Sequence, residues 1–119
     1  MRLICTLAAA GAVALLATSP AAPSTPPKLF GTVGPGFTIS LKQNGKAVKK
    51  LLKPGMYTFV IADKASIHNF VVEGPGVERD ITTPSFTGTK TVTIRLRKGK
   101  YKFYCRPHES SMFGFFTVA

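Results

Sequence analysis

Residues 104–114 read YCRPHESSMFG, and this stretch gathers three potential metal-binding side chains in one short loop. It holds the thiol of Cys105, the imidazole of His108 and the thioether of Met112 within eight residues. The only other histidine of the chain, His68, lies far upstream at the start of a predicted strand. Thiolate and thioether are soft donors and imidazole is borderline, a combination that suits copper. Calcium would need more carboxylates than Glu109 alone supplies, and structural zinc would need a second Cys or a third His.

The sequence on either side of this loop is typical of β-structure. Apolar and polar residues alternate over 37–42 and again over 91–97, which predicts strands with one buried face. Further strands are expected over 56–62, 67–73, 101–105 and 113–118, with Asn44-Gly45 as a hairpin turn. No convincing amphipathic helix is found. The pattern predicts an all-β, antiparallel Greek-key sandwich of about seven to eight strands over residues 29–119.

The beginning of the chain has the pattern of a secretory signal peptide. Met1-Arg2 is followed by an apolar run to Ala17 that is too short for a comfortable membrane span, and then by small residues. We therefore expect a signal peptide over 1–21 and a Pro-rich spacer over 22–28, with an uncleaved membrane anchor as the alternative. Cleavage would remove Cys5 and leave Cys105 without a partner for an internal disulfide.

The loop resembles that of the cupredoxins, the small blue-copper proteins such as plastocyanin, pseudoazurin and amicyanin. The resemblance rests on Cys-x-x-His-x-x-x-Met at 105–112, His68-Asn69-Phe70 and Gly114, and it covers roughly residues 37–118. It implies a cupredoxin-like domain in which His68, Cys105 and His108 form a trigonal plane around one copper ion and Met112 is a long axial ligand. The chain departs slightly from relatives, since several of them place two or four residues between the His and the Met.

The same resemblance gives two neighbouring residues a role around the copper ligands. Asn69 would direct its N–H at the Cys105 sulfur and tie the two ligand loops together through its side chain. Pro107 has no N–H where some relatives supply a second hydrogen bond to that sulfur, so the thiolate would accept one backbone bond.

Each of these residues also has a plainer interpretation. Cys105 could be a small buried hydrophobe, His68 a core histidine and Met112 a packing residue. Asn69 could be an ordinary strand-end residue. A nucleophile–base pair of Cys105 and His108 is disfavoured, because no third orienting group is visible.

Taken together, these sequence features predict an exported type 1 copper protein that carries single electrons and is not an enzyme. Sixteen Lys and Arg against five Asp and Glu give a net charge of +11, which favours acidic redox partner proteins. Arg106 and Phe113 are expected at the docking surface of a monomer in the periplasm or the extracellular cell envelope. Export argues against nucleic acid, and no integral span is expected after cleavage. A copper-binding and delivery protein with the same ligands, and a basic structural β-sandwich without metal, remain as alternatives.

Overall fold

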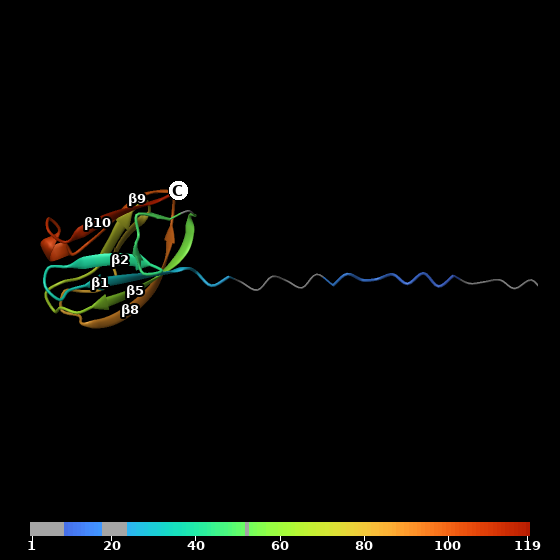
Figure 1. Ribbon diagram of the computed structural model, residues 1–119, viewed down its shortest axis with the longest axis horizontal. Helices are drawn as coiled ribbons and strands as arrows, with labels where there is room; N and C mark the ends of the chain where they lie inside the picture. Colours follow the sequence, from blue (N-terminus) through green and yellow to red (C-terminus); the bar gives the residue numbers. More distant parts are fainter. Residues whose placement is uncertain (1–8, 18–23, 52) are drawn as a thin grey trace, which may run out of the picture.

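Two five-stranded β-sheets pack face to face in this protein (Figure 1). The computed structural model describes residues 9–17, 24–51 and 53–119. The elements are β1 (Lys28–Val33), β2 (Ile39–Gln43), β3 (Lys46–Ala47), β4 (Lys50–Leu51), β5 (Gly55–Asp63), β6 (Val71–Gly74), β7 (Val77–Asp80), β8 (Gly88–Leu96), β9 (Gly99–Tyr104), the 3₁₀ turn η1 (Arg106–His108) and β10 (Phe113–Val118). Since β3 and β4 have only two residues each, eight longer strands make up the sandwich. The predicted fold class is confirmed.

The strand order explains why the sheets are mixed rather than wholly antiparallel. One sheet has the order β3-β2-β1-β5-β8 and the other β4-β10-β9-β6-β7. β1 pairs in parallel with β5, and β10 pairs in parallel with β4, so the prediction of purely antiparallel pairing is wrong at these two places. After the β1–β2 hairpin, residues 44–51 and 53–54 stay at the end of the sandwich where β1 starts. β5 therefore starts at the same end as β1 and runs beside it in the same direction.

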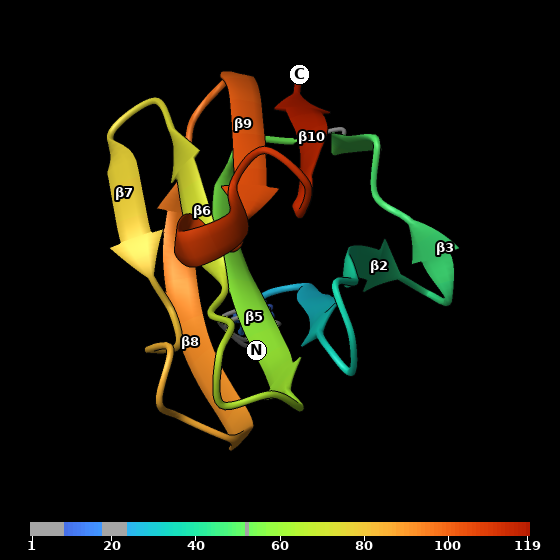
Figure 2. The same ribbon diagram turned by 90° about the vertical axis from the view of Figure 1, so that its left-hand side faces the viewer.

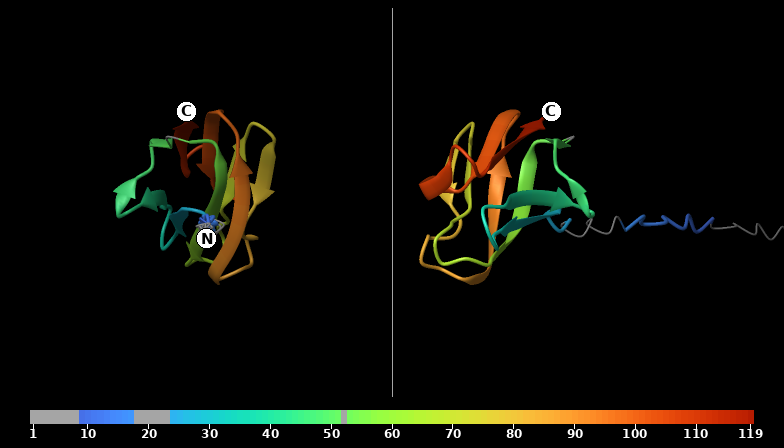
Figure 3. Two further views of the ribbon diagram at one scale, coloured as in Figure 1. Left: turned by 90° about the vertical axis from the view of Figure 1, so that its right-hand side faces the viewer. Right: turned by 60° about the vertical axis from the view of Figure 1, so that its left-hand side comes forward.

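The sandwich has two distinct ends. The η1 end carries η1 and the loop over 64–70 between β5 and β6, and Figure 2 faces it. The distal end carries the opposite turns, and residues 9–17 lie beyond it (Figure 3).

The core lies between the sheets, where strand alternation places apolar side chains. In β5, Tyr57, Phe59 and Ile61 are buried and alternate with partly exposed residues. Opposite them Tyr101 stacks on Phe116 with ring centroids 5.1 Å apart. Buried rings of this size are the main source of stability in a small domain.

Several local predictions can be compared directly with the structure. Asn44 and Gly45 have φ angles of 51° and 77°, the positive values that a two-residue hairpin turn requires, so that prediction is confirmed. The strand expected from Ile67 is wrong at its start: β6 begins at Val71, and His68 lies in the preceding loop. Phe37, expected on a buried face, is 61% exposed, because it precedes β2 and lies outside the sheet.

Only part of the expected signal peptide and spacer can be described. Residues 9–17 form neither helix nor strand, and the rest of 1–21, with Cys5, lies outside the described residues. Of the expected spacer, residues 24–27 precede β1 as irregular chain. Within the described residues, no helix is long and apolar enough to cross a membrane.

Candidate metal centre

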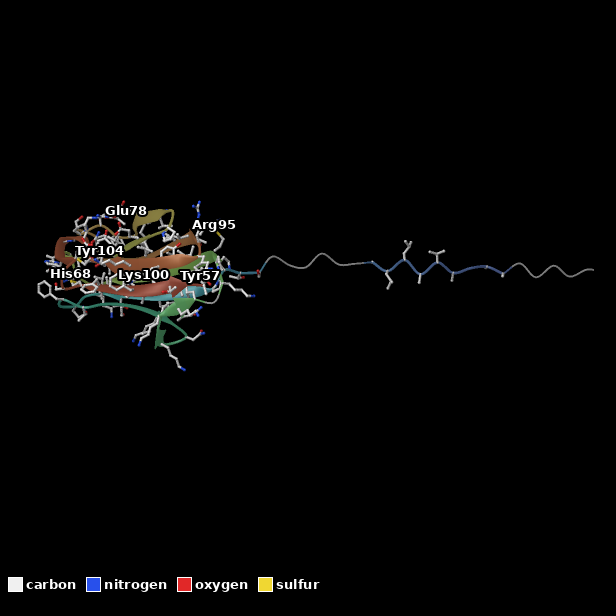
Figure 4. The ribbon with its side chains drawn as sticks, turned by 90° about the horizontal axis from the view of Figure 1, so that it is seen from above. Tyr57, His68, Glu78, Arg95, Lys100 and Tyr104 are labelled. Atoms are coloured by element: carbon white, nitrogen blue, oxygen red, sulfur yellow. The ribbon has the colours of Figure 1, made fainter. Side chains whose placement is uncertain are left out.

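Three metal-binding side chains from two loops meet at the η1 end. His68 comes from the loop between β5 and β6, Cys105 directly follows β9, and His108 is the last residue of η1. Their donor atoms all lie within 4.8 Å of one another. Figure 4 shows His68 at this end, far from Tyr57 at the other.

The spacing of the three donors fits a single first-row metal ion. The Cys105 sulfur lies 3.7 Å from Nδ1 of His68 and 3.7 Å from Nδ1 of His108, and the two Nδ1 atoms are 3.1 Å apart. A point in the plane of this triangle lies about 2.0 Å from all three atoms, close to the metal–ligand distances of about 2.0–2.3 Å that nitrogen and sulfur ligands make. One thiolate and two imidazoles are also the donor chemistry of a trigonal copper site. The residues present therefore fit one copper ion.

A backbone carbonyl fixes the orientation of the His68 ring. Nε2 of His68 lies 2.8 Å from the carbonyl oxygen of Gly36. A carbonyl oxygen only accepts hydrogen bonds, so Nε2 of His68 carries the ring proton and donates a hydrogen bond to the Gly36 carbonyl. In the neutral ring this leaves the lone pair on Nδ1, directed at Cys105 and His108. His68 is thus held in the tautomer that a metal ligand needs.

Met112 closes the loop opposite Cys105. The β9–β10 register pairs Tyr104 with Phe113, and the N–H of Cys105 continues it by donating to the carbonyl of Met112 at 3.0 Å. Residues directly opposite in an antiparallel pair carry their side chains on the same face. Both side chains are buried, Cys105 at 0% and Met112 at 1% exposure. Met112 therefore belongs to the wall of the same buried site.

A network that includes Asn69 joins the two ligand loops. Oδ1 of Asn69 accepts a hydrogen bond from the backbone N–H of Arg106 at 2.8 Å, and its Nδ2 donates to Asp80 at 3.2 Å. Arg106 completes the ring, because Nε donates to Asp80 at 3.0 Å and Nη2 donates to the second carboxylate oxygen. Glu78 lies 3.5 Å from the same guanidinium. Hydrogen bonding from Arg106 lowers the pKa of Asp80, and the same pair raises the pKa of Arg106.

The ion pair between Arg106 and Asp80 partly neutralises the positive charge at the η1 end. The sequence predicted Arg106 at the docking surface, and in the structure its charge is paired with the acidic residues of β7. Asp80 is far from the loop in sequence and gave no signal of this contact. Pro107 lies inside η1, next to the paired arginine. Burial raises the pKa of Tyr104, the residue before Cys105.

Phe37 is the site residue that sequence reasoning missed. Its ring lies edge-on to both imidazoles, with centroids 5.2 Å from His68 and 5.0 Å from His108. The neighbouring Gly36 supplies the carbonyl that orients His68. Phe37 and Ile67, the residue before His68, are 61% and 57% exposed, so apolar surface lies beside the histidine pair. Phe113 is 47% exposed and contacts Phe115 and the Lys102 ammonium. The one available signal was Phe37 itself, a large aromatic residue directly after Gly-Pro-Gly.

Comparisons with known proteins agree with this site. A family model described as copper binding proteins, plastocyanin/azurin family, matches residues 32–119. Among solved structures, the copper protein rusticyanin is 15% identical with a TM-score of 0.56, covering 77% of this chain and 76% of its own. The "blue" copper protein auracyanin A from Chloroflexus aurantiacus is 17% identical with a TM-score of 0.55, covering 80% of this chain and 100% of its own.

A larger protein contains a similar fold as one part. A multi-copper oxidase from Pediococcus acidilactici is 11% identical with a TM-score of 0.52, covering 90% of this chain but 29% of its own. Comparison with curated proteins gives no match. The family model spans most of the described sandwich and includes all three donors. This chain therefore belongs to the plastocyanin/azurin family of copper-binding proteins, and one copper ion is its cofactor.

Proposed function

We propose that this protein carries single electrons between redox partners, and that His68, Cys105, His108 and Met112 would hold the copper ion that supplies this chemistry. The observation that carries the proposal is the convergence of three donors around one point in a largely buried site. Bound copper supplies a one-electron couple. The chain's own residues hold the ligands in one arrangement, exclude water from the thiolate and leave one edge of the site accessible.

Burial of the donors favours electron transfer over substrate chemistry. His68 and Cys105 are 0% exposed and Met112 is 1% exposed, so a substrate has no direct route to them. Two surface hollows lie elsewhere, one along β7 and β8 and one near Tyr57. We infer that the protein is not an enzyme and that electrons leave through the edge of His108, the only partly exposed donor.

The surface around His108 suits brief encounters. Exposed Phe37, Ile67 and Phe113 offer apolar contact without a deep pocket. The net charge, +11 for the whole sequence and +10 without residues 1–21 (15 basic minus 5 acidic residues), adds a long-range attraction for an acidic partner protein, which is screened beyond about 8 Å at physiological salt. Arg106 would act at the rim through the ion pair it makes with Asp80 rather than as a free charge. We propose a monomer that acts after export, in the periplasm or the cell envelope, with residues 1–21 as the signal.

The test is copper loading of the purified protein, followed by visible absorption, electron paramagnetic resonance and voltammetry. We expect an intense visible band from thiolate-to-copper charge transfer and reversible one-electron cycling. Cys105→Ser should bind copper without that band, and His68→Ala should weaken or alter the site. An unchanged band in Cys105→Ser would overturn the ligand assignment. Tight Cu(I) binding without reversible cycling would instead indicate copper delivery.

A further inference from the structure

Asp63 ends the inward-facing row of β5 at the η1 end of the sandwich. The three inward positions before it, Tyr57, Phe59 and Ile61, carry buried hydrophobic side chains, and strand alternation makes Asp63 the next in the row. Asp63 is itself only 2% exposed. Its backbone is held on both sides, because β5 lies between β1 and β8 and pairs with both strands at this residue.

The Asp63 carboxylate has one hydrogen-bonded oxygen and one that lacks a partner. Oδ1 accepts a hydrogen bond from the N–H of Ala65 at 3.2 Å, while the buried Oδ2 has no hydrogen-bond partner in the described part of the protein. Burying a polar oxygen in this way destabilises a fold, whereas an apolar side chain here would simply extend the core row. The hydrogen bond to Ala65 is therefore the contact that explains an acid at this position.

That hydrogen bond fixes the loop where it leaves the sheet. The N–H of Lys64 still continues the pairing with β1, by donating to the carbonyl of Val33 at 2.9 Å. The next N–H, that of Ala65, turns inward to Asp63. Asp side chains commonly hold turns in this way, by accepting from an N–H two residues further on. The direction in which the chain departs towards His68 is thus set by the Asp63 carboxylate.

Ala65 also lies at the centre of the contacts that place His68. Its carbonyl accepts a hydrogen bond from the backbone N–H of His68 at 3.3 Å, which closes the turn over 65–68. Its side chain packs against the backbone at Gly34, where an added Cβ would lie only 2.9 Å from the Cβ of Ala65. Gly36, in the same loop as Gly34, accepts the hydrogen bond from the His68 ring. Both the backbone and the ring of His68 therefore depend on where Ala65 lies.

We infer that Asp63 is a positioning residue of the copper site, which holds Ala65 and through it sets the place of the His68 donor atom. Cys105 and His108 come from the other ligand loop, so the effect of Asp63 is directed at His68. The inference rests on His68 as a copper ligand, as proposed above. The position of His68 can nevertheless be followed in the metal-free protein.

The experiment separates this hydrogen bond from the overall stability of the full-length protein. Asp63→Asn keeps an acceptor oxygen for the Ala65 N–H. Asp63→Leu removes the acceptor and continues the apolar row, and Asp63→Ala removes it without bulk and replaces Asp63→Leu if that variant does not fold. The control is Tyr101→Phe, which removes a buried hydroxyl at the distal end that accepts the Arg97 N–H at 2.8 Å. Thermal melting checks that each variant folds.

The first measurement uses no copper. Amide hydrogen exchange of His68, followed by NMR relative to the amides of β5, should become roughly fivefold faster in Asp63→Leu and Asp63→Ala, as expected for the loss of one hydrogen bond. It should stay near the wild-type value in Asp63→Asn and Tyr101→Phe. After copper loading, the copper hyperfine splitting in electron paramagnetic resonance should change in the two variants that lack the acceptor and be retained in the other two.

Unchanged exchange of His68 in both Asp63→Leu and Asp63→Ala would overturn the proposal. An equal change in Asp63→Asn would also overturn it, because the acceptor oxygen would then not be what positions the loop. The same holds for an equal change in Tyr101→Phe, since lower stability alone would then explain the result. A wild-type protein without the intense visible band would count against the proposed function, and the metal-free exchange would still decide the role of Asp63.

Discussion

The ion pair between Arg106 and Asp80 should contribute measurably to stability, because it joins the loop after Cys105 to β7. Two N–H groups of the guanidinium reach the two carboxylate oxygens, and Asp80 also accepts from Asn69. The side chains are 44% and 40% exposed, so solvent screening keeps the energy well below that of a buried pair. Good bidentate geometry within a network places the coupling near the upper end of the range for exposed pairs, about 1 kcal/mol.

A double-mutant cycle measures that coupling directly. Asp80→Asn, Arg106→Gln and the double variant are unfolded with urea at low ionic strength. The interaction energy is the difference between the stability change of the double variant and the sum of the two single changes. For a domain of this size, about 1 kcal/mol corresponds to a change in Tm of roughly 4–8 °C. The matched control is the Lys102–Glu109 pair, a single contact of 2.9 Å in the same region, which should give a smaller coupling.

The pH dependence gives the prediction a sign. Because hydrogen bonding from Arg106 lowers the pKa of Asp80 below its ordinary value of 3.8, the folded state holds this carboxylate ionised more strongly than the unfolded state does. The stabilisation is therefore complete well above pH 3.8 and is lost as the pH falls through the lower folded pKa. Wild type should lose more stability on acidification than Asp80→Asn. A coupling indistinguishable from zero at low salt, with both single variants folded, would refute this reasoning.

Three further changes test other parts of the structure. Met112→Leu should retain copper and raise its reduction potential, as measured by voltammetry, because a donor that favours Cu(II) is removed. Complete loss of copper would contradict this and mean that Met112 is needed for copper binding itself. Gly114→Ala should destabilise the fold by about 1–3 kcal/mol in urea, because a Cβ there would overlap the ring of Phe103 directly opposite; an unchanged midpoint would mean that this ring moves freely. Phe37→Ser should leave the fold intact and slow electron exchange with an acidic partner in stopped-flow experiments, because it removes exposed apolar surface beside His108; an unchanged rate would move the docking surface elsewhere.

The metal-binding loop could be predicted from sequence because its chemistry is local. Cys105, His108 and Met112 lie on one hairpin, where spacing alone brings the side chains together. Strand alternation likewise predicted that Ile94 and Leu96 point inward, since the period of two is a property of each strand by itself.

The contacts around that loop could not be predicted, because they join segments far apart in sequence. Gly36 meets His68 only once the chain has folded into the sandwich, and Asp80 meets Arg106 only once β7, β6 and β9 lie side by side in one sheet. Alternation assigns a residue to a face but does not name its partner on another strand. The parallel pairing of β1 with β5 was missed for the same reason: it depends on the end of the sandwich at which the chain leaves β2 and enters β5, and the sequence between these strands has no strong periodic signal.

The arrangement of the donors follows from protein contacts on every side. Gly36 orients His68 through its carbonyl, and Asn69 links that loop to the residue after Cys105. The Cys105 N–H is bound to Met112, and the Met112 N–H donates in turn to the carbonyl of His108 at 2.9 Å. His68, Cys105, His108 and Met112 are thus each held by at least one hydrogen bond that involves no metal. A site positioned in this way resists rearrangement when the charge at its centre changes by one unit, and low rearrangement is what a fast electron carrier needs.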